Sequence, residues 1–185
     1  MRVLTVVAMI VLLLYPLLVY VGMQWLEPRV LGLAIATVYL LRFACKVKHW
    51  WQRLLIVTAL TSAAAVLWWS NDETLLKLLP TAINVAMAGF FMYSLVHPPT
   101  LPARVAALDY PEGLPDIVLT YTTWVTRIWV GFFLVNAALA AVTALFASRE
   151  VWALYNGVIA YLLMGLLFGG EFAYRHLIFH KKHAL

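Results

Sequence analysis

The sequence predicts an all-α, polytopic transmembrane helical bundle of about six spans, with both termini in the cytoplasm. Apolar residues make up 65% of the 185 residues and charged residues only 11%, against roughly 45–50% and about 25% in soluble proteins. Six apolar segments follow one another along the chain, and basic residues gather at alternate segment ends. A soluble fold could not cover so much apolar surface with so few polar groups, whereas lipid as the outer solvent removes that conflict. We expect one transmembrane domain over residues 1–185.

The six apolar segments reach or approach the length of a membrane span, which is about 20 residues for a hydrocarbon core of about 30 Å. They cover residues 3–23, 30–45, 54–69, 75–96, 128–147 and 151–170. The first is too long for a signal-peptide core and is not followed by a small-residue cleavage site, so we interpret it as a retained helix. The second and third are shorter. They could span a locally thinned bilayer or form a re-entrant hairpin, and we favour spanning.

Basic residues and tryptophans give the predicted orientation. Among the 13 Lys and Arg residues, only Arg29, Lys77 and Arg149 fall on the outer side when the N-terminus is cytoplasmic, as the positive-inside rule requires. All 8 tryptophans lie near predicted segment ends, where amphipathic rings prefer to sit. The pattern predicts a multi-pass membrane protein. The net charge of +5 therefore indicates topology and contacts with lipid head groups, and not nucleic acid.

The longest connection, residues 97–126, holds five prolines in its first part. Proline interrupts helices, so we predict a Pro-rich cytoplasmic loop over residues 97–116. Residues 116–126 begin with Asp116 and repeat apolar side chains at helical spacing, which predicts an interfacial helix ahead of the fifth span.

The last two spans are joined by Ser148-Arg149-Glu150 and must be antiparallel neighbours. Arg127 and Glu171 are equally distant from Arg149, so they lie at the same depth near the inner interface. A charged pair there is a functional-site candidate. The alternative is that both are boundary residues and that Glu171 pairs with Arg175, one helical turn away.

A ligand site on the cytoplasmic face is predicted from polar residues near that pair. Mixed arginine and carboxylate groups at a lipid interface can bind a phosphate or carboxylate head group. Asn136 and Asn156 lie deeper and either line a polar cavity or join helices. The candidate ligand-binding residues are Arg104, Tyr121, Arg127, Asn136, Asn156, Glu171 and Arg175.

Glycines in the last span predict close helix packing. Gly157, Gly165 and Gly169 share a face, and Gly165 and Gly169 form a GxxxG pair. Such faces let helix backbones approach in lipid. We expect tight packing within the chain and consider a homodimer through the Gly165/Gly169 face.

Motifs for metal binding and catalysis are missing from the sequence. Cys45 is the single cysteine, which excludes an intramolecular disulfide and a Cys-based metal site. His176 and His180 have a zinc-ligand spacing but lack a third ligand nearby. We predict no cofactor and no metal, and whether the chain is an enzyme stays open.

A family resemblance rests on three stretches in the C-terminal third: Arg127-Ile128-Trp129 with Phe132-Phe133 and Asn136, Glu150 to Gly157, and Tyr161 to Gly165 with Gly170-Glu171. They resemble a family of small bacterial inner-membrane proteins whose genes lie beside aryl-polyene-type pigment and lipid biosynthesis enzymes. They are similar, more distantly, to the intracellular septation A family. The resemblance implies a Gram-negative inner membrane and a role in envelope or polyene-lipid metabolism, without a reaction or catalytic residues.

Three functions follow as hypotheses. The first is an accessory or scaffold protein of a membrane-associated lipid or aryl-polyene biosynthetic pathway, with membrane lipids and biosynthetic enzymes as partners. The second is a membrane-embedded enzyme or lipid carrier that binds an anionic head group at its cytoplasmic face. The third is a septation or envelope scaffold. A transporter is disfavoured because the sequence shows no clear inverted repeat and few ionisable groups at mid-membrane.

Overall fold

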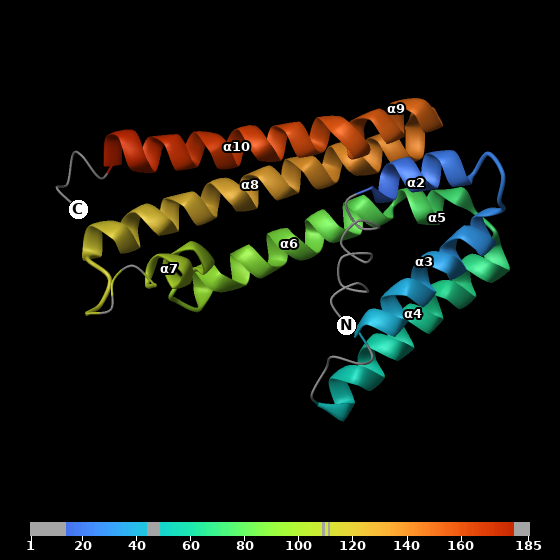
Figure 1. Ribbon diagram of the computed structural model, residues 1–185, viewed down its shortest axis with the longest axis horizontal. Coiled ribbons are helices and arrows are strands. Elements are labelled where there is room, and N and C mark those ends of the chain that lie inside the picture. The colour runs from blue at the N-terminus through green and yellow to red at the C-terminus, as the bar shows by residue number, and fades with distance from the viewer. Residues whose placement is uncertain (1–13, 44–48, 109, 111, 180–185) are drawn as a thin grey trace. The chain divides into compact units, whose positions relative to one another are not determined.

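The structure is a computed structural model that describes residues 14–43, 49–108, 110 and 112–179. Every regular element in these ranges is a helix (Figure 1), which confirms the all-α prediction for the described part of the chain. The contacts divide the chain into two compact units. Unit 1 comprises residues 1–79 and 143–158, and unit 2 comprises residues 80–142 and 159–185. Each is described by itself below, and a single domain over residues 1–185 stays a prediction.

Three helical segments in the described ranges are long and apolar enough to cross a membrane, which indicates a membrane protein. They cover Glu73–Val96, Asp116–Phe146 and Arg149–Leu177, and two shorter apolar stretches cover Pro28–Val38 and Val57–Ser70. Spans four, five and six of the prediction therefore have helices of spanning length. The count of six spans and the orientation of the termini stay predictions. Residues 3–13 and 44–45 of the first two predicted spans lie outside the described residues.

Unit 1 contains a helical hairpin and several short helices. Its elements are α2 (Tyr15–Gly22), α3 (Pro28–Phe43), α4 (Trp50–Ser70), α5 (Glu73–Lys77), α9 (Arg149–Leu154) and most of the π-helical turn η1 (Tyr155–Ile159). The helices α3 and α4 lie side by side (Figure 1) and form the hairpin. Tyr15, Val19, Leu31, Leu67 and Trp152 are buried together in the core of this unit.

A break between α5 and α6 (Leu79–Val96) organises unit 1. Pro80 has no N–H to donate to the carbonyl of Leu76 four residues earlier. Tyr15 Oη donates a 2.7 Å hydrogen bond to that carbonyl instead. The neighbouring carbonyl of Lys77 accepts a 3.0 Å bond from Trp152 Nε1. Because both donor side chains are almost fully buried, these bonds hold α2 and α9 against α5 where the helix is interrupted.

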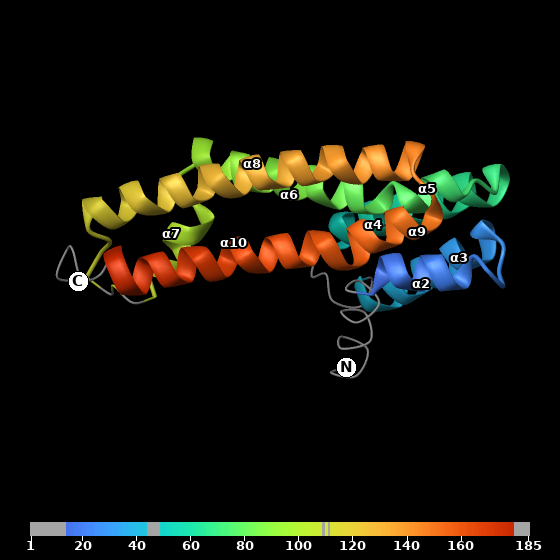
Figure 2. The same ribbon diagram turned by 90° about the horizontal axis from the view of Figure 1, so that it is seen from above.

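Unit 2 is built on long helices. It contains α6, α7 (Leu101–Ala106), α8 (Asp116–Phe146) except its last turn, α10 (Ala160–Tyr174) and the π-helical turn η2 (Arg175–Phe179). Within this unit α8 and α10 run alongside each other (Figures 1 and 2). The amide of Asn136 on α8 donates a 2.9 Å hydrogen bond to Asn84 Oδ1 on α6. Phe91 on α6 packs against Phe133 on α8, with ring centroids 5.4 Å apart.

Residues 116–126 are helical, as predicted, and they continue without a break into the predicted fifth span as helix α8. An interfacial position for these residues stays a prediction. Helix α8 is continuous over 31 residues, because neither proline nor glycine occurs between Asp116 and Val130 to interrupt it. Thr122 and Thr126 also hydrogen-bond within the helix, to carbonyls four residues earlier, at 2.8 and 2.6 Å. Their hydroxyls therefore need no partner in lipid.

The Pro-rich stretch 97–116 is also more ordered than the predicted loop, because it contains α7. This helix begins after Thr100, whose Oγ1 accepts a hydrogen bond from the Ala103 N–H. Pro102 occupies the first turn of α7, where a missing N–H costs nothing. The prolines therefore delimit a short helix and do not prevent one.

The glycine prediction is corrected as well. A Cβ atom built on Gly165 or Gly169 would meet no atom of the described residues within 4 Å, so neither glycine forms the expected tight contact within that part of the chain. At Gly157 a Cβ would lie 3.2 Å from Leu17 Cγ and 3.6 Å from Pro16 Cβ. The close approach lies here because the short α2 packs against the start of the last helical segment. A homodimer through Gly165 and Gly169 stays a prediction.

Candidate functional site

A cavity of about 300 Å³ in unit 2 lies between α6, α7, α8 and α10. Its wall is mainly apolar and aromatic, formed chiefly by Phe91, Leu101, Val105, Val125, Trp129 and Phe168. Tyr110 and Thr122 also line it, and so do the polar side chains of Tyr121, Glu171 and Arg175. An apolar cavity with a few convergent polar groups is the usual form of a site for a small molecule or lipid.

Tyr121, Glu171 and Arg175 contact one another. Tyr121 Oη on α8 donates a 2.9 Å hydrogen bond to Glu171 Oε1 on α10. Arg175 Nε lies 3.3 Å from the same oxygen and forms an ion pair with it. The side chain of Glu171 is 18% exposed and that of Arg175 is 33% exposed. The tyrosine, carboxylate and guanidinium therefore form one polar cluster, with formal charges that cancel.

One donor in this cluster lacks a hydrogen-bond acceptor. Arg175 Nε is buried, and it makes no hydrogen bond with any residue that the structure describes. Its ion pair with Glu171 brings the charges together without a hydrogen bond from this N–H. Buried donors almost always find an acceptor, and a guanidinium has five N–H donors in a fixed plane that suits carboxylate and phosphate oxygens. Arg175 therefore lines the cavity with a guanidinium whose Nε is not hydrogen-bonded within the described residues.

A second cavity of about 530 Å³ lies between α8 and α10. It shares four lining residues with the first, namely Tyr121, Val125, Trp129 and Glu171. Its other lining residues are mainly apolar and include Trp124, Ile128, Leu166, Leu167 and Gly170. The polar pair Tyr121–Glu171 therefore faces both cavities.

Of the seven predicted site residues, the structure brings together Tyr121, Glu171 and Arg175. Of the two alternatives for Glu171, the structure shows the pair with Arg175 one helical turn away, and it describes no ion pair between Glu171 and Arg127. Arg127 is exposed, and its guanidinium lies 5.2 Å from the ring centroid of Trp124. Arg127 follows Tyr121 by six residues, about 240° around a helix, so the two side chains point in different directions despite the equal-depth argument.

The remaining three predicted residues line neither of these cavities. Arg104 is exposed on α7, and its Nε donates to the carbonyl of Pro99 at 2.9 Å. Asn136 forms the buried bond between α8 and α6 described above. Asn156 belongs to unit 1, where its Nδ2 donates to Thr143 Oγ1 at 3.2 Å. Both asparagines therefore join helices, which is the second of the two alternatives that the sequence left open for them.

The apolar wall of the cavity is what the sequence reasoning missed. Leu101 and Val105 on α7 line it, because α7 folds where an irregular loop was expected. Their four-residue spacing after the N-cap Thr100 is a helix signal that could have identified them. The place of Phe91 and Phe168 in the wall depends on how three helices pack, which spacing alone does not give.

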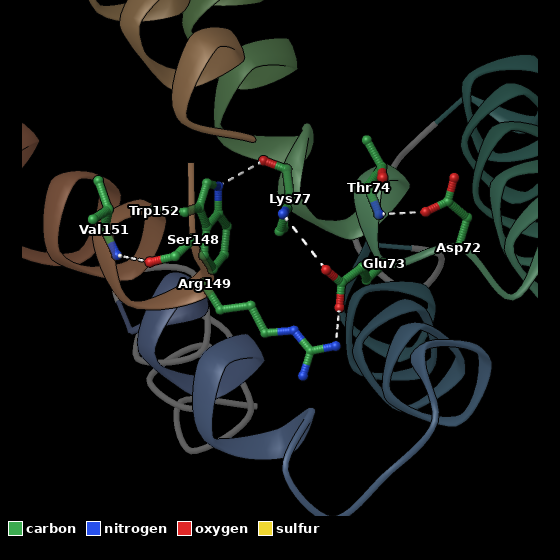
Figure 3. A network of polar contacts seen from close by, with 8 residues as sticks. All are labelled: Asp72, Glu73, Thr74, Lys77, Ser148, Arg149, Val151 and Trp152. Carbon is green, nitrogen blue, oxygen red and sulfur yellow. Dashed lines mark hydrogen bonds and ion pairs between the residues drawn. The ribbon is translucent and has the colours of Figure 1, made fainter. Parts of the chain in front are cut away.

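A second polar cluster lies in unit 1 (Figure 3). Glu73 forms ion pairs with Lys77, at 3.6 Å, and with Arg149. Asp72 caps α5 by accepting a 2.8 Å hydrogen bond from the Thr74 N–H, and this backbone bond is the main cause that lowers the pKa of Asp72 below its ordinary value. One of these contacts caps a helix and the others pair opposite charges. We therefore interpret the cluster as a structural connection between α5 and α9.

Within the described ranges, no group of three or more His, Cys, Asp or Glu side chains is placed to hold a metal ion. Comparison of the chain with known protein families, with curated proteins and with solved structures finds no match. The functional argument therefore rests on the geometry of the cavities.

Proposed function

We propose that this chain is an integral inner-membrane accessory protein that binds an amphipathic lipid in unit 2, within a membrane-associated lipid or aryl-polyene biosynthetic pathway. The observation that carries the lipid-binding part is the cluster of Tyr121, Glu171 and Arg175 at one part of a mainly apolar cavity. The pathway is what the family resemblance implies.

The chemistry of the cavity supports a lipid over a water-soluble ligand. Aromatic and branched side chains form most of its wall, which suits a hydrocarbon or conjugated chain. The polar cluster supplies an N–H donor and a carboxylate acceptor to a head group. Because the charges of Glu171 and Arg175 cancel, the head group is recognised by hydrogen bonds to oriented groups more than by net charge.

Lipid retention by the purified chain tests this proposal. Arg175→Gln and Tyr121→Phe should each reduce the lipid that native mass spectrometry detects on the detergent-purified protein, by roughly tenfold for the arginine. The matched controls are Arg127→Gln, which removes an exposed guanidinium outside both cavities, and Tyr15→Phe, which removes a hydroxyl in unit 1. Both controls should retain lipid at the wild-type level. Equal loss in Arg127→Gln and Arg175→Gln would refute a site centred on Arg175.

We also propose six spans with both termini in the cytoplasm. The distribution of basic residues supports this orientation, and Trp25 and Trp69, at predicted outer ends, are 83% and 92% exposed. Reporter fusions after Lys182 should report cytoplasm, and fusions after Asp72 should report periplasm. A cytoplasmic signal at Asp72 would contradict the six-span arrangement.

A further inference from the structure

The two cavities of unit 2 share a ridge of α8 as part of their lining. Tyr121, Val125 and Trp129 line both of them, and their four-residue spacing places them in one row along a helix. One cavity extends from this ridge towards α6 and α7, and the other runs along α10. Glu171 is the polar residue of α10 that both share.

We infer that the ligand is an amphiphile with two apolar chains, one in each cavity, joined at a head group that the Tyr121–Glu171–Arg175 cluster binds. This inference rests on the proposed function and specifies its ligand class. Two chains that diverge from one head group match a pair of apolar cavities that share the polar pair Tyr121–Glu171, with Arg175 in the wall of the first.

Gly170 keeps the second cavity open. It lines that cavity, and a Cβ atom placed on it would meet nothing within 4 Å. A larger side chain at this position therefore enters cavity space without displacing another part of the described chain. Ala106 plays the corresponding role in the first cavity, since it lines that cavity and not the second.

These two positions allow each cavity to be blocked separately. Gly170→Leu fills the second cavity, and Gly165→Leu is its matched control because Gly165 is equally open but lines neither cavity. Ala106→Leu narrows the first cavity, and Ala107→Leu, on an exposed neighbour outside both cavities, is its control. The full chain is purified in detergent and each variant is checked for an unchanged thermal transition.

The probes are a diacyl phosphatidylethanolamine and its one-chain lyso form, and native mass spectrometry measures the affinity of each. We expect Gly170→Leu and Ala106→Leu each to lower the affinity for the two-chain lipid by roughly tenfold. In each variant the affinity for the lyso lipid should stay within about twofold of the wild-type value, since one cavity remains open to its single chain. The two control variants should bind both lipids as the wild type does.

Two results would overturn the inference, and they differ from failure of the proposed function. Unchanged binding of the two-chain lipid in Gly170→Leu would mean that the second cavity holds no chain. Loss of both lipids in one blocked variant, with the other blocked variant silent, would mean that a single cavity holds the whole ligand. If the wild-type protein bound neither lipid, both the lipid-binding proposal and the inference about two chains would fail.

Discussion

The two polar clusters are built on the same local pattern and differ in what surrounds them. In unit 1, Glu73 pairs with Lys77 one helical turn on, and in unit 2, Glu171 pairs with Arg175 one helical turn on. Each glutamate also contacts a side chain of another helix, which is Arg149 for Glu73 and Tyr121 for Glu171. The sequence pattern alone therefore does not distinguish them.

The difference lies in the remaining donors and in the space beside them. Around Glu73, the added partner is a second cation, and the adjacent carbonyl of Lys77 is bonded by Trp152 (Figure 3). Around Glu171, the added partner is a neutral hydroxyl, the buried Nε of Arg175 lacks an acceptor, and two cavities lie alongside. The comparison teaches that an ion pair marks a candidate site when its donors stay unused beside a cavity, and a structural connection when they do not.

A large effect is expected on stability in unit 1. Glu73→Gln leaves Lys77, whose side chain is only 8% exposed, without its carboxylate. Removing one partner of a fully buried pair costs about 3–5 kcal/mol. Because Glu73 and Arg149 are partly solvated, at 27% and 48% exposure, we expect about 2 kcal/mol less free energy of unfolding, measured by denaturant titration in detergent.

Glu171→Gln is the matched change in unit 2. The amide oxygen that this substitution introduces would still accept a hydrogen bond from Tyr121, and Arg175 is one-third exposed, so we expect a loss of about 1 kcal/mol or less. Glu171→Gln should reduce lipid retention more than Glu73→Gln does. Equal losses of stability in the two variants, with lipid retention unaffected in both, would contradict the distinction between the clusters.

A second pair of variants compares the glycines of the two units. Gly157→Leu should lower the free energy of unfolding by about 1–3 kcal/mol through overpacking, because even a Cβ there would crowd Leu17 and Pro16. Gly165→Leu should be neutral, or stabilising by up to about 1 kcal/mol through helix propensity, because its Cβ meets open space. Thermal transitions followed by circular dichroism in the same detergent measure both. A destabilised Gly165→Leu variant would show that this glycine faces another chain or an undescribed segment.

Composition and spacing predicted the helical membrane class and three residues of the polar cluster, because those features follow from local sequence. Tyr121, Glu171 and Arg175 were found through charge and depth near the inner interface. The sequence left both Arg127 and Arg175 open as partners of Glu171 because equal depth does not give helix rotation, which places Arg127 over Trp124. The cavity could not be predicted either, since its wall combines Phe91, Val105 and Phe168 from three separate helices. The tight glycine contact was misplaced because it depends on where α2 packs.

The smallest expected effect concerns Asp72, which caps α5 in unit 1. Its pKa lies below its ordinary value of 3.8, chiefly because the Thr74 N–H donates to the carboxylate. A folded-state pKa below the unfolded one means that the carboxylate contributes stability above the unfolded pKa, and that this contribution is lost as pH falls through the folded pKa. The free energy of unfolding should therefore decline below about pH 4 in part because Asp72 gains a proton.

Two substitutions separate the charge of Asp72 from its capping bond. Asp72→Ala should cost about 1 kcal/mol at neutral pH, the usual value of a helix N-cap. Asp72→Asn retains an oxygen that accepts from Thr74 and should lose less. The stability difference between wild type and Asp72→Asn should be constant above about pH 5 and shrink below about pH 4, because only the wild-type side chain titrates. Parallel pH profiles for the two proteins across that range would mean that the hydrogen bond from Thr74 does not depend on the carboxylate charge.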